Sequence, residues 1–368
     1  MAHPEVIIVG GGVIGASCAR SLSARGVSTT LLDPGPEPGA ATPAAAGMLA
    51  PFAEAQPEDP FLSFCVRARD LYTELAAELR DQTGIDIGLW KEGILQVALT
   101  EGEVAPLKGA VTWRRQGGFA VDWLSIDEIR RLVPGIGPDA MGGAYAPEDG
   151  ALDPSALRNA LLASARANGA DIRSERVERL LFDGEQVSGV RTADGVRSAG
   201  AVILAAGAWS PRLGGVPGPL PVEPVRGQLA ALAWPTGERP NIVYAGGGYV
   251  LARQGEAIAG STMERVGFAA ETTEDGIASV LLTARRIYPA LDGAPVTRSW
   301  AGLRPVTPDG RPILGPDPVI RNLWYATGHG RNGILLAGMT GDVIARLFTG
   351  EEVEYDLSEV GPGRFRRP

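Results

Sequence analysis

A glycine-rich turn near the start of the chain constrains the fold more than any other feature. The apolar run Val6–Val9 ends at Gly10-Gly-Gly-Val-Ile-Gly15, a GxGxxG pattern, and residues 13–25 continue with helical spacing. A second apolar run, 27–32, ends at Asp33. This order of strand, turn, helix and strand is the context in which the pattern indicates a dinucleotide-binding βαβ unit.

Each position of the turn has a physical role. Gly10 permits the tight bend, Gly12 lets the backbone approach a pyrophosphate at the positive end of the helix, and Gly15 allows close helix–strand packing. Asp33 is placed to accept hydrogen bonds from a ribose and would repel a 2′-phosphate. The alternative is a βαβ unit whose glycines serve packing alone. The turn itself does not choose between NAD and FAD.

A later segment favours a flavin. Residues 201–207, AVILAAG, predict a buried strand that ends in small residues, followed by Ala208-Trp209-Ser210. This is similar to the second small-residue strand end of flavoproteins with a two-dinucleotide fold, where the backbone passes close to FAD. We therefore expect Ala206, Gly207 and Trp209 to contact the cofactor.

Composition excludes several classes of function. The chain of 368 residues has a formal net charge of −9, so a nucleic-acid partner is not expected. Its two cysteines, Cys18 and Cys65, lie in apolar helical surroundings and predict buried thiols rather than a metal site. The first residues lack the basic region of a signal peptide, and no apolar stretch reaches the roughly 18 residues of a membrane span. We therefore expect a cytoplasmic protein without a membrane partner.

Three further stretches point to a family: Thr42–Leu49 (TPAAAGML), Trp300–Gly315 (WAGLRPVTPDGRPILG) and Gly328–Leu336 (GHGRNGILL). Together with the glycine turn, they make the chain resemble the D-amino acid oxidase superfamily of FAD enzymes from Val6 to Phe348. Within that superfamily the chain is most similar to the bacterial glycine oxidases of thiamine biosynthesis.

The resemblance implies an α/β fold: a Rossmann-like FAD-binding domain of the D-amino acid oxidase type with a second, α+β substrate domain. Both domains are expected to be discontinuous. The predicted FAD-binding segments are 1–83, 142–217 and 299–368, and the predicted substrate-domain segments are 84–141 and 218–298. Helices are expected at 61–82, at 154–168 with Asp153 as N-cap, and near 274–288. The relatives often form homotetramers, so a homo-oligomer is expected.

The resemblance also implies which residues bind FAD. Non-covalent attachment is expected, because neither cysteine lies near 300–335. The implied FAD contacts are Val13, Ile14, Asp33 and Pro34 at the AMP half, Ala41, Thr42, Ala46, Gly47 and Met48 at the pyrophosphate and isoalloxazine, Val177 at the adenine, and His329, Gly330, Arg331, Asn332, Gly333, Ile334 and Leu335 around the flavin ring.

Three residues match the substrate contacts of the relatives: Arg304, Tyr249 and Arg331. Arg304 lies in the apolar segment WAGLRP, where a guanidinium needs an anionic partner, and a carboxylate matches its geometry bidentately. A structural ion pair is the alternative for Arg304, solvent exposure for Arg331, and ordinary strand packing for Tyr249. His329 could be a general base, although holding the backbone of its loop is favoured.

The expected reaction is oxidative deamination of glycine or a small amine. The resemblance implies hydride transfer from the substrate Cα to flavin N5. The imine then hydrolyses to glyoxylate and ammonia, and O2 reoxidises the flavin to give H2O2. Alternatives are a D-amino acid, sarcosine or D-hydroxyproline oxidase, or a dehydrogenase that uses an electron carrier. A flavin-binding module without catalysis and an NAD-linked dehydrogenase are alternatives from other classes. The Pro/Ala/Gly-rich stretch 50–59 is predicted to be a mobile lid over the active site.

Overall fold

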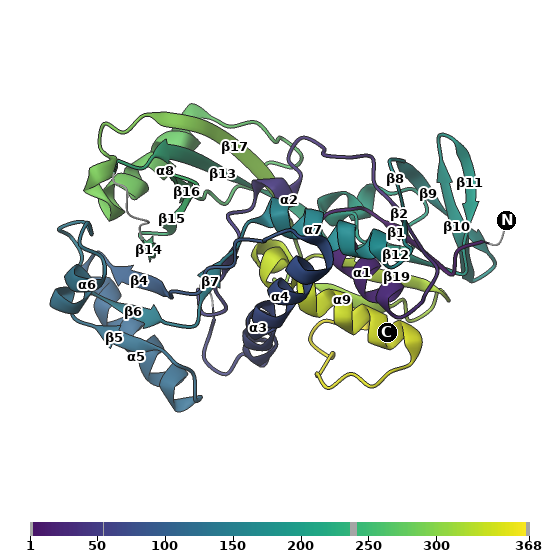
Figure 1. Cartoon of the computed structure of the whole chain (residues 1–368), viewed down its shortest axis with the longest axis horizontal. Helices are drawn as coiled ribbons and strands as arrows, with labels where there is room; N and C mark the ends of the chain where they lie inside the picture. Colours follow the sequence, from purple (N-terminus) through teal and green to yellow (C-terminus); the bar gives the residue numbers. More distant parts are fainter. Residues whose placement is uncertain (1–2, 54, 236–240, 366–368) are drawn as a thin grey trace.

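The computed structural model describes residues 3–53, 55–235 and 241–365. Figure 1 shows an elongated molecule with two large sheets toward its opposite ends and two helices, α3 (Phe61–Asp70) and α4 (Tyr72–Thr83), between them. The first sheet holds the glycine turn. The second sheet faces it across a cavity lined by residues of both.

The six-stranded sheet is parallel except at one edge. Its order is β18 (Ile313–Pro316), β19 (Leu323–Thr327), β12 (Ala201–Leu204), β1 (Val6–Val9), β2 (Thr29–Leu32) and β8 (Asp171–Arg173), and only β18 runs antiparallel to its neighbour. Because parallel strands end at the same edge, the residues after β1, β2 and β12 meet there. These are Gly10, Asp33 and Ala205.

Both faces of β1 are buried, as a central parallel strand requires. Val6 and Ile8 pack in a core with α1 (Val13–Ala24), α7 (Pro154–Ala167) and α9 (Gly333–Thr349). Ile7 and Val9 pack on the opposite face with apolar residues of a three-stranded antiparallel sheet. That sheet consists of β9 (Val177–Asp183), β10 (Gln186–Thr192) and β11 (Gly195–Ser198).

Two of the expected helices differ in how far local sequence predicts their ends. Helix α7 begins as predicted, because the Asp153 carboxylate accepts hydrogen bonds from the backbone of Ser155 at 2.8 Å and Ala156 at 3.0 Å, with Pro154 at the first helical position. The single helix predicted for 61–82 is instead two helices, α3 and α4. They are divided at Leu71, whose backbone remains in the helical region.

The eight-stranded sheet is mostly antiparallel. Its order is β17 (Val296–Val306), β13 (Glu223–Ala233), β16 (Glu256–Gly260), β15 (Gly248–Arg253), β14 (Ile242–Ala245), β4 (Ile94–Ala98), β6 (Gly142–Ala146) and β5 (Asp122–Leu124). Helix α8 (Glu274–Ile287) packs against β13, β15 and β16, while α5 (Glu101–Gln116) and α6 (Ile126–Leu132) pack near β5 and β6. Side chains of Leu229, Tyr249 and Ile258 pack with Ala46 and Trp90 in a separate core.

Short elements complete the fold. They are α2 (Ala41–Ala44), the pair β3 (Met48–Leu49) and β7 (Gly150–Ala151), and the 3-10 turns η1 (Gly207–Arg212), η2 (Pro289–Leu291), η3 (Gly330–Asn332) and η4 (Pro362–Phe365). Of these turns, η2 packs against α8 and η4 packs against β18. Strand β17 pairs with β13 from Val296 to Val306, so the sheet continues beyond residue 299. The division into five chain segments stays a prediction. Within the described part of the chain, no helix is long and apolar enough to cross a membrane.

Candidate active site

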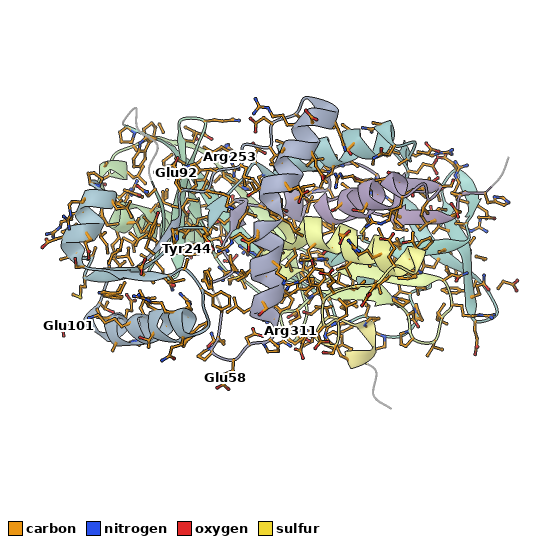
Figure 2. The ribbon with its side chains drawn as sticks, turned by 60° about the horizontal axis from the view of Figure 1, so that its bottom comes forward. Glu58, Glu92, Glu101, Tyr244, Arg253 and Arg311 are labelled. Atoms are coloured by element: carbon orange, nitrogen blue, oxygen red, sulfur yellow. The ribbon has the colours of Figure 1, made fainter. Side chains whose placement is uncertain are left out.

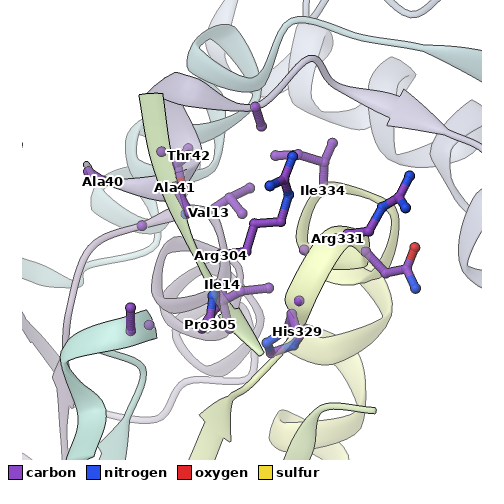
Figure 3. A pocket seen from close by; sticks show the side chains of 18 of the residues that line it. Val13, Ile14, Ala40, Ala41, Thr42, Arg304, Pro305, His329, Arg331 and Ile334 are labelled. Carbon is purple, nitrogen blue, oxygen red and sulfur yellow. The ribbon is translucent and has the colours of Figure 1, made fainter. Parts of the chain in front are cut away.

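A cavity of about 960 Å³ lies where the two sheets approach each other. Its walls include the glycine turn, α2 and the residues after it, the start of α7, η1, parts of β13 and β17, and the turn before α9. Figure 3 shows that side chains distant in sequence converge there: Val13 and Ile14 from α1, Arg304 from β17, and Arg331 from the turn before α9.

The backbone of the glycine turn is packed so closely that side chains are excluded. Gly10 has φ +104°, and a Cβ there would lie 2.6 Å from the carbonyl oxygen of Ala205. A Cβ on Gly15 would overlap the carbonyl of Gly10. The first glycine therefore permits the bend and the third permits the helix to approach the strand, as the sequence predicts.

The N-terminus of α1 is suited to a pyrophosphate. Gly12 is its N-cap and provides no capping side chain, and the first turn contains no acidic residue. The Val13 backbone N–H donates to Thr42 Oγ1 at 3.0 Å, which fixes the α2 segment against this turn. The partial positive charge of the helix end is thus left facing the cavity without a protein anion in the turn.

Asp33 has a partner that the sequence did not reveal. Arg158 of α7 donates from Nη2 to Asp33 Oδ2 at 2.8 Å and also donates to the carbonyl of Gly11. The backbone N–H of Gly35 donates to Asp33 Oδ1 at 3.2 Å. A carboxylate accepts about four hydrogen bonds, so these two leave capacity for the ribose hydroxyls.

Arg253 holds the segment Ala46–Met48 at the cavity. From β15 it donates to the carbonyl oxygens of Ala46 and, at 2.6 Å, of Leu152. Gly47 has φ +90°, and a Cβ on it would overlap the Leu152 carbonyl. An arginine of the eight-stranded sheet therefore fixes a segment predicted to contact the isoalloxazine.

Arg304 lies on the cavity side of β17, half-buried. Its Nη2 donates to Ser261 Oγ at 2.6 Å and its Nη1 donates to the Thr262 carbonyl at 3.2 Å. Both acceptors are neutral oxygens, and these two bonds orient the guanidinium at the cavity. A planar guanidinium with five N–H donors matches the geometry of a carboxylate.

Tyr249 lies beside this guanidinium. Its side chain is buried, and its hydroxyl hydrogen-bonds to the side chain of Ser261. Burial raises the pKa of Tyr249 above its ordinary value, although the positive charges of Arg304 and Arg331 lower it in part. The hydroxyl therefore remains a donor at neutral pH. The Tyr244 ring, which also lines the cavity, packs against the Tyr249 ring with a centroid separation of 5.4 Å.

The turn before α9 contributes Arg331 and His329. Arg331 is exposed but lines the cavity, and Figure 3 shows it near Ile334 in the same region as Arg304. His329 is buried, its Nε2 lies 3.0 Å from Thr340 Oγ1, and burial lowers its pKa to about 3. This imidazole is neutral and engaged with α9, which supports the predicted role in holding its loop rather than a role as general base.

Most of the predicted contacts meet at this one cavity. Those that line it are Gly10, Gly12, Val13, Ile14, Asp33, Pro34, Ala41, Thr42, Ala46, Gly47, Met48, Val177, Ala206, Gly207, Trp209, Tyr249, Arg304, His329, Gly330, Arg331, Asn332, Gly333 and Ile334. Gly15 and Leu335 do not line it: Gly15 packs against the turn, and Leu335 is a residue of α9 whose side chain is buried in the core. The individual contacts to FAD and substrate stay predictions.

Sequence reasoning missed several residues of the site. Arg158, Arg253 and Ser261 gave no signal, because their partners come from distant segments. Gly227 could have been noticed as an isolated glycine within a strand pattern. Cys65 also lines the cavity, but burial raises the pKa of its thiol to about 12. Both cysteines are buried as predicted, and the described residues contain no cluster that could hold a metal ion.

The chain is similar to known proteins in both sequence and structure. The family described as FAD dependent oxidoreductase matches residues 5–347. Glycine oxidase from Geobacillus kaustophilus is 35% identical, covering 96% of this chain and 95% of the relative. A crystal structure of glycine oxidase from Geobacillus kaustophilus superposes with a TM-score of 0.94 at 34% identity, covering both chains completely.

A longer relative matches equally well. The bifunctional protein ThiO/ThiG of Trichormus variabilis is 38% identical over 99% of this chain, but the chain spans only 55% of that relative. The predicted fold of the D-amino acid oxidase type and the predicted FAD cofactor are confirmed by the family match and the structural similarity. From residue 5 to residue 347, the chain is a member of the FAD-dependent oxidoreductase family.

Proposed function

We propose that this protein is an FAD-dependent amino-acid oxidase that deaminates glycine or a similarly small amino acid. The observation that carries the proposal is the placement of Arg304, with Tyr249 beside it, in the same cavity as the dinucleotide turn. A guanidinium that is oriented at the wall of a cavity can bind a substrate carboxylate bidentately. The choice of substrate is supported by relatives named glycine oxidase, which match this chain over nearly their full length.

Arg304 would fix the carboxylate and thereby orient the substrate. The Tyr249 hydroxyl would donate a further hydrogen bond, and Arg331 would complete the positive end of the cavity. Because the substrate is held in a fixed orientation toward the cofactor, the activation free energy can be lower by several kcal/mol. When FAD is bound, it supplies the acceptor for the hydride that leaves the substrate Cα.

The histidine that lines the cavity does not offer a general base. His329 is neutral, buried and engaged with Thr340. We therefore propose that the substrate reacts as the free amine, whose lone pair forms the C=N bond as the hydride leaves. Water then hydrolyses the imine to ammonia and an oxo acid, and O2 takes the two electrons together with two protons to become H2O2.

An anaerobic experiment tests the proposal. The yellow holoenzyme is mixed with glycine, sarcosine and a set of D-amino acids, and bleaching of the flavin absorbance is followed. We expect glycine to bleach the flavin, and air to restore the colour with release of H2O2. Faster bleaching by a bulkier D-amino acid would favour the related oxidases. Bleaching that air does not reverse would indicate a dehydrogenase, and no bleaching by any amine would favour a flavin-binding module.

Three further features belong to the proposal. We propose non-covalent FAD, because the two cysteines lie inside helices α1 and α3 and both thiols are buried. Acid precipitation should then release all colour into the supernatant. A homotetramer, a location in the cytoplasm and a role in thiamine biosynthesis are proposed from the resemblance to ThiO and glycine oxidase. Gel filtration of the holoenzyme tests the first of these.

A further inference from the structure

A polar network lies on the back of the sheet behind Arg304. Side chains alternate along a strand, so Gly227 and the cross-strand partner of Arg304, Val225, share the cavity face of β13. Arg226 and Gln228 then point to the opposite face, toward α8. Gln228 is fully buried and Arg226 is nearly so.

The network fixes the segment that follows β16. Residues 261–264 continue along β13, because Arg226 and Glu264 exchange two backbone hydrogen bonds of 2.9 Å. The backbone N–H of Gln228 donates to Thr262 Oγ1 at 2.9 Å. This is the same segment that holds the guanidinium, through Ser261 Oγ and the Thr262 carbonyl.

Side chains secure this segment from behind. The Glu264 carboxylate accepts from Arg226 Nε at 2.7 Å and from Gln228 Nε2 at 3.0 Å. Partial burial acts to raise the pKa of Glu264, but these hydrogen bonds and the Arg226 charge outweigh it, so the net pKa is lowered. The carboxylate is therefore ionised at neutral pH. Its side chain is 27% exposed, which makes it accessible to substitution without opening the core.

Gln228 extends the network to the start of α8. Its Oε1 accepts from the Thr273 backbone at 2.7 Å, and its Nε2 donates to Thr273 Oγ1 at 3.0 Å. Thr273 is the N-cap of α8, and a Cβ on Gly276 of that helix would overlap the Gln228 amide. The polar atoms of this buried amide are therefore satisfied, and helix, strand and segment 261–264 are joined as one unit.

We propose that Glu264 and Gln228, with Arg226, are positioning residues for Arg304: they set the Ser261–Thr262 segment and thereby the orientation in which the guanidinium meets a carboxylate. None of the three is among the residues that line the cavity, so they act through the hydrogen bonds of Arg304. The inference rests on the proposed function, since it assigns the substrate carboxylate to Arg304.

Glu264→Ala is the primary test, with Glu256→Ala as its matched control. Glu256 is 26% exposed against 27% for Glu264 and also pairs with an arginine, Arg298, but at the opposite end of β16. Glycolate is the probe of carboxylate binding, because it keeps the carboxylate of glycine and has a hydroxyl in place of the amine. The KM for glycine and the Kd for glycolate, the latter read from the flavin spectrum of the holoenzyme, should rise about tenfold in Glu264→Ala. The kcat, the FAD affinity and the melting temperature should match those of Glu256→Ala.

Two additional measurements separate positioning from general stability. Glu264→Gln, which keeps an oxygen acceptor for Arg226 and Gln228, should recover most of the glycolate affinity. In an Arg304→Ala background, Glu264→Ala should cause no further loss, because the residue acts through Arg304. Equal losses in both backgrounds, or a Glu264→Ala enzyme indistinguishable from the control, would overturn the inference.

The outcomes also separate this inference from the proposed function. A native holoenzyme that neither binds glycolate nor is bleached by any amino acid would refute both. A native holoenzyme that binds glycolate through Arg304, but is insensitive to Glu264→Ala, would refute the network alone. Gln228→Met provides an independent check, and if that variant folds, its glycolate affinity should fall with that of Glu264→Ala.

Discussion

The guanidinium of Arg304 lies directly over Gly227 of the neighbouring strand. A Cβ on Gly227 would come within 2.5 Å of Arg304 Cζ and would overlap both terminal nitrogens. The register explains this, since Gly227 pairs with Gly302 and Arg304 follows two residues later on the same face. The position of the cation therefore depends on the absence of one carbon atom on another strand.

Gly227→Ala should displace the guanidinium and weaken substrate binding without releasing FAD. A misplacement of about 1 Å can cost about two decades in kcat/KM. We expect a loss of this size for glycine, with the FAD content unchanged. Gly109→Ala in α5, where a Cβ meets no atom within 4 Å, is the control and should behave like the native enzyme. Native kinetics in Gly227→Ala would contradict the position of Arg304.

Arg304→Lys should keep FAD but raise the KM for amino acids sharply, because a lysine cannot reproduce the bidentate geometry. Arg304→Ala should lose roughly 3–4 kcal/mol of transition-state stabilisation, which is about two to three decades in kcat/KM. Turnover of an amine without a carboxylate should hardly change. Loss of FAD instead of substrate affinity would place the carboxylate anchor elsewhere, with Arg331 as the next candidate.

Asp33→Ala should weaken FAD binding by about 1.5–3 kcal/mol, because a charge-assisted hydrogen bond to the ribose is removed. The flavin-loaded fraction should be reduced by substrate at a nearly native rate. Equilibrium binding of FAD to the apoprotein measures the first quantity. Since Asp33 also pairs with Arg158, Arg158→Met is the comparison variant: an effect of equal size would assign the loss to the ion pair rather than to the ribose.

Limited proteolysis should cut first within 50–59, the predicted lid, and a carboxylate inhibitor should slow the cut. The prediction includes Glu54, which lies outside the described residues. Both ends of the stretch are held, because Arg114 donates to the Phe52 carbonyl at 2.7 Å and Arg311 donates to Asp59 at 2.8 Å. Gln56 and Glu58 are exposed, and Figure 2 shows Glu58 at the edge of the molecule. A cut rate that the inhibitor does not alter would refute the lid.

Acidification should destabilise the fold through His329. Its pKa is lowered to about 3 by burial, against an ordinary value of 6.5. The folded state therefore resists protonation of His329, whereas the unfolded state takes up the proton below pH 6.5. The free energy of unfolding is unaffected above that pH and decreases by about 1.4 kcal/mol for each pH unit as the pH falls toward 3. Urea unfolding at several pH values between 7 and 5 should show this slope in the native protein and a shallower one in His329→Gln. Equal slopes would show that His329 is not the group responsible.

The parts of the fold that sequence predicts best are those set by local chemistry. The glycine turn, the strands around it and the Asp153 cap of α7 follow from residues that act on their near neighbours. The break at Leu71 does not, because both sides of it have helical spacing and the backbone at the break remains helical. Tertiary packing decides such boundaries.

The candidate site was predicted where the resemblance supplied it and missed where distant partners decide it. Arg304 could be proposed as an anchor from its apolar neighbours. Its orientation by Ser261, and the space above Gly227, depend on the pairing of β13 with β17 and with the segment after β16. No local pattern contains that register, since it arises from strands brought together by the whole fold.

The strand order of the six-stranded sheet has a consequence for the time at which the protein matures during synthesis. The glycine turn after β1 is made first, but β12, which pairs with β1, comes from residues 201–204, β19, which pairs with β12, comes from residues 323–327, and α9 begins at residue 333. Contacts between such distant segments form late because the chain between them must first be closed into a loop. The nascent chain therefore carries its glycine turn long before the segments that complete the cavity have been made, and we expect the cavity to form only after residue 334 has left the ribosome.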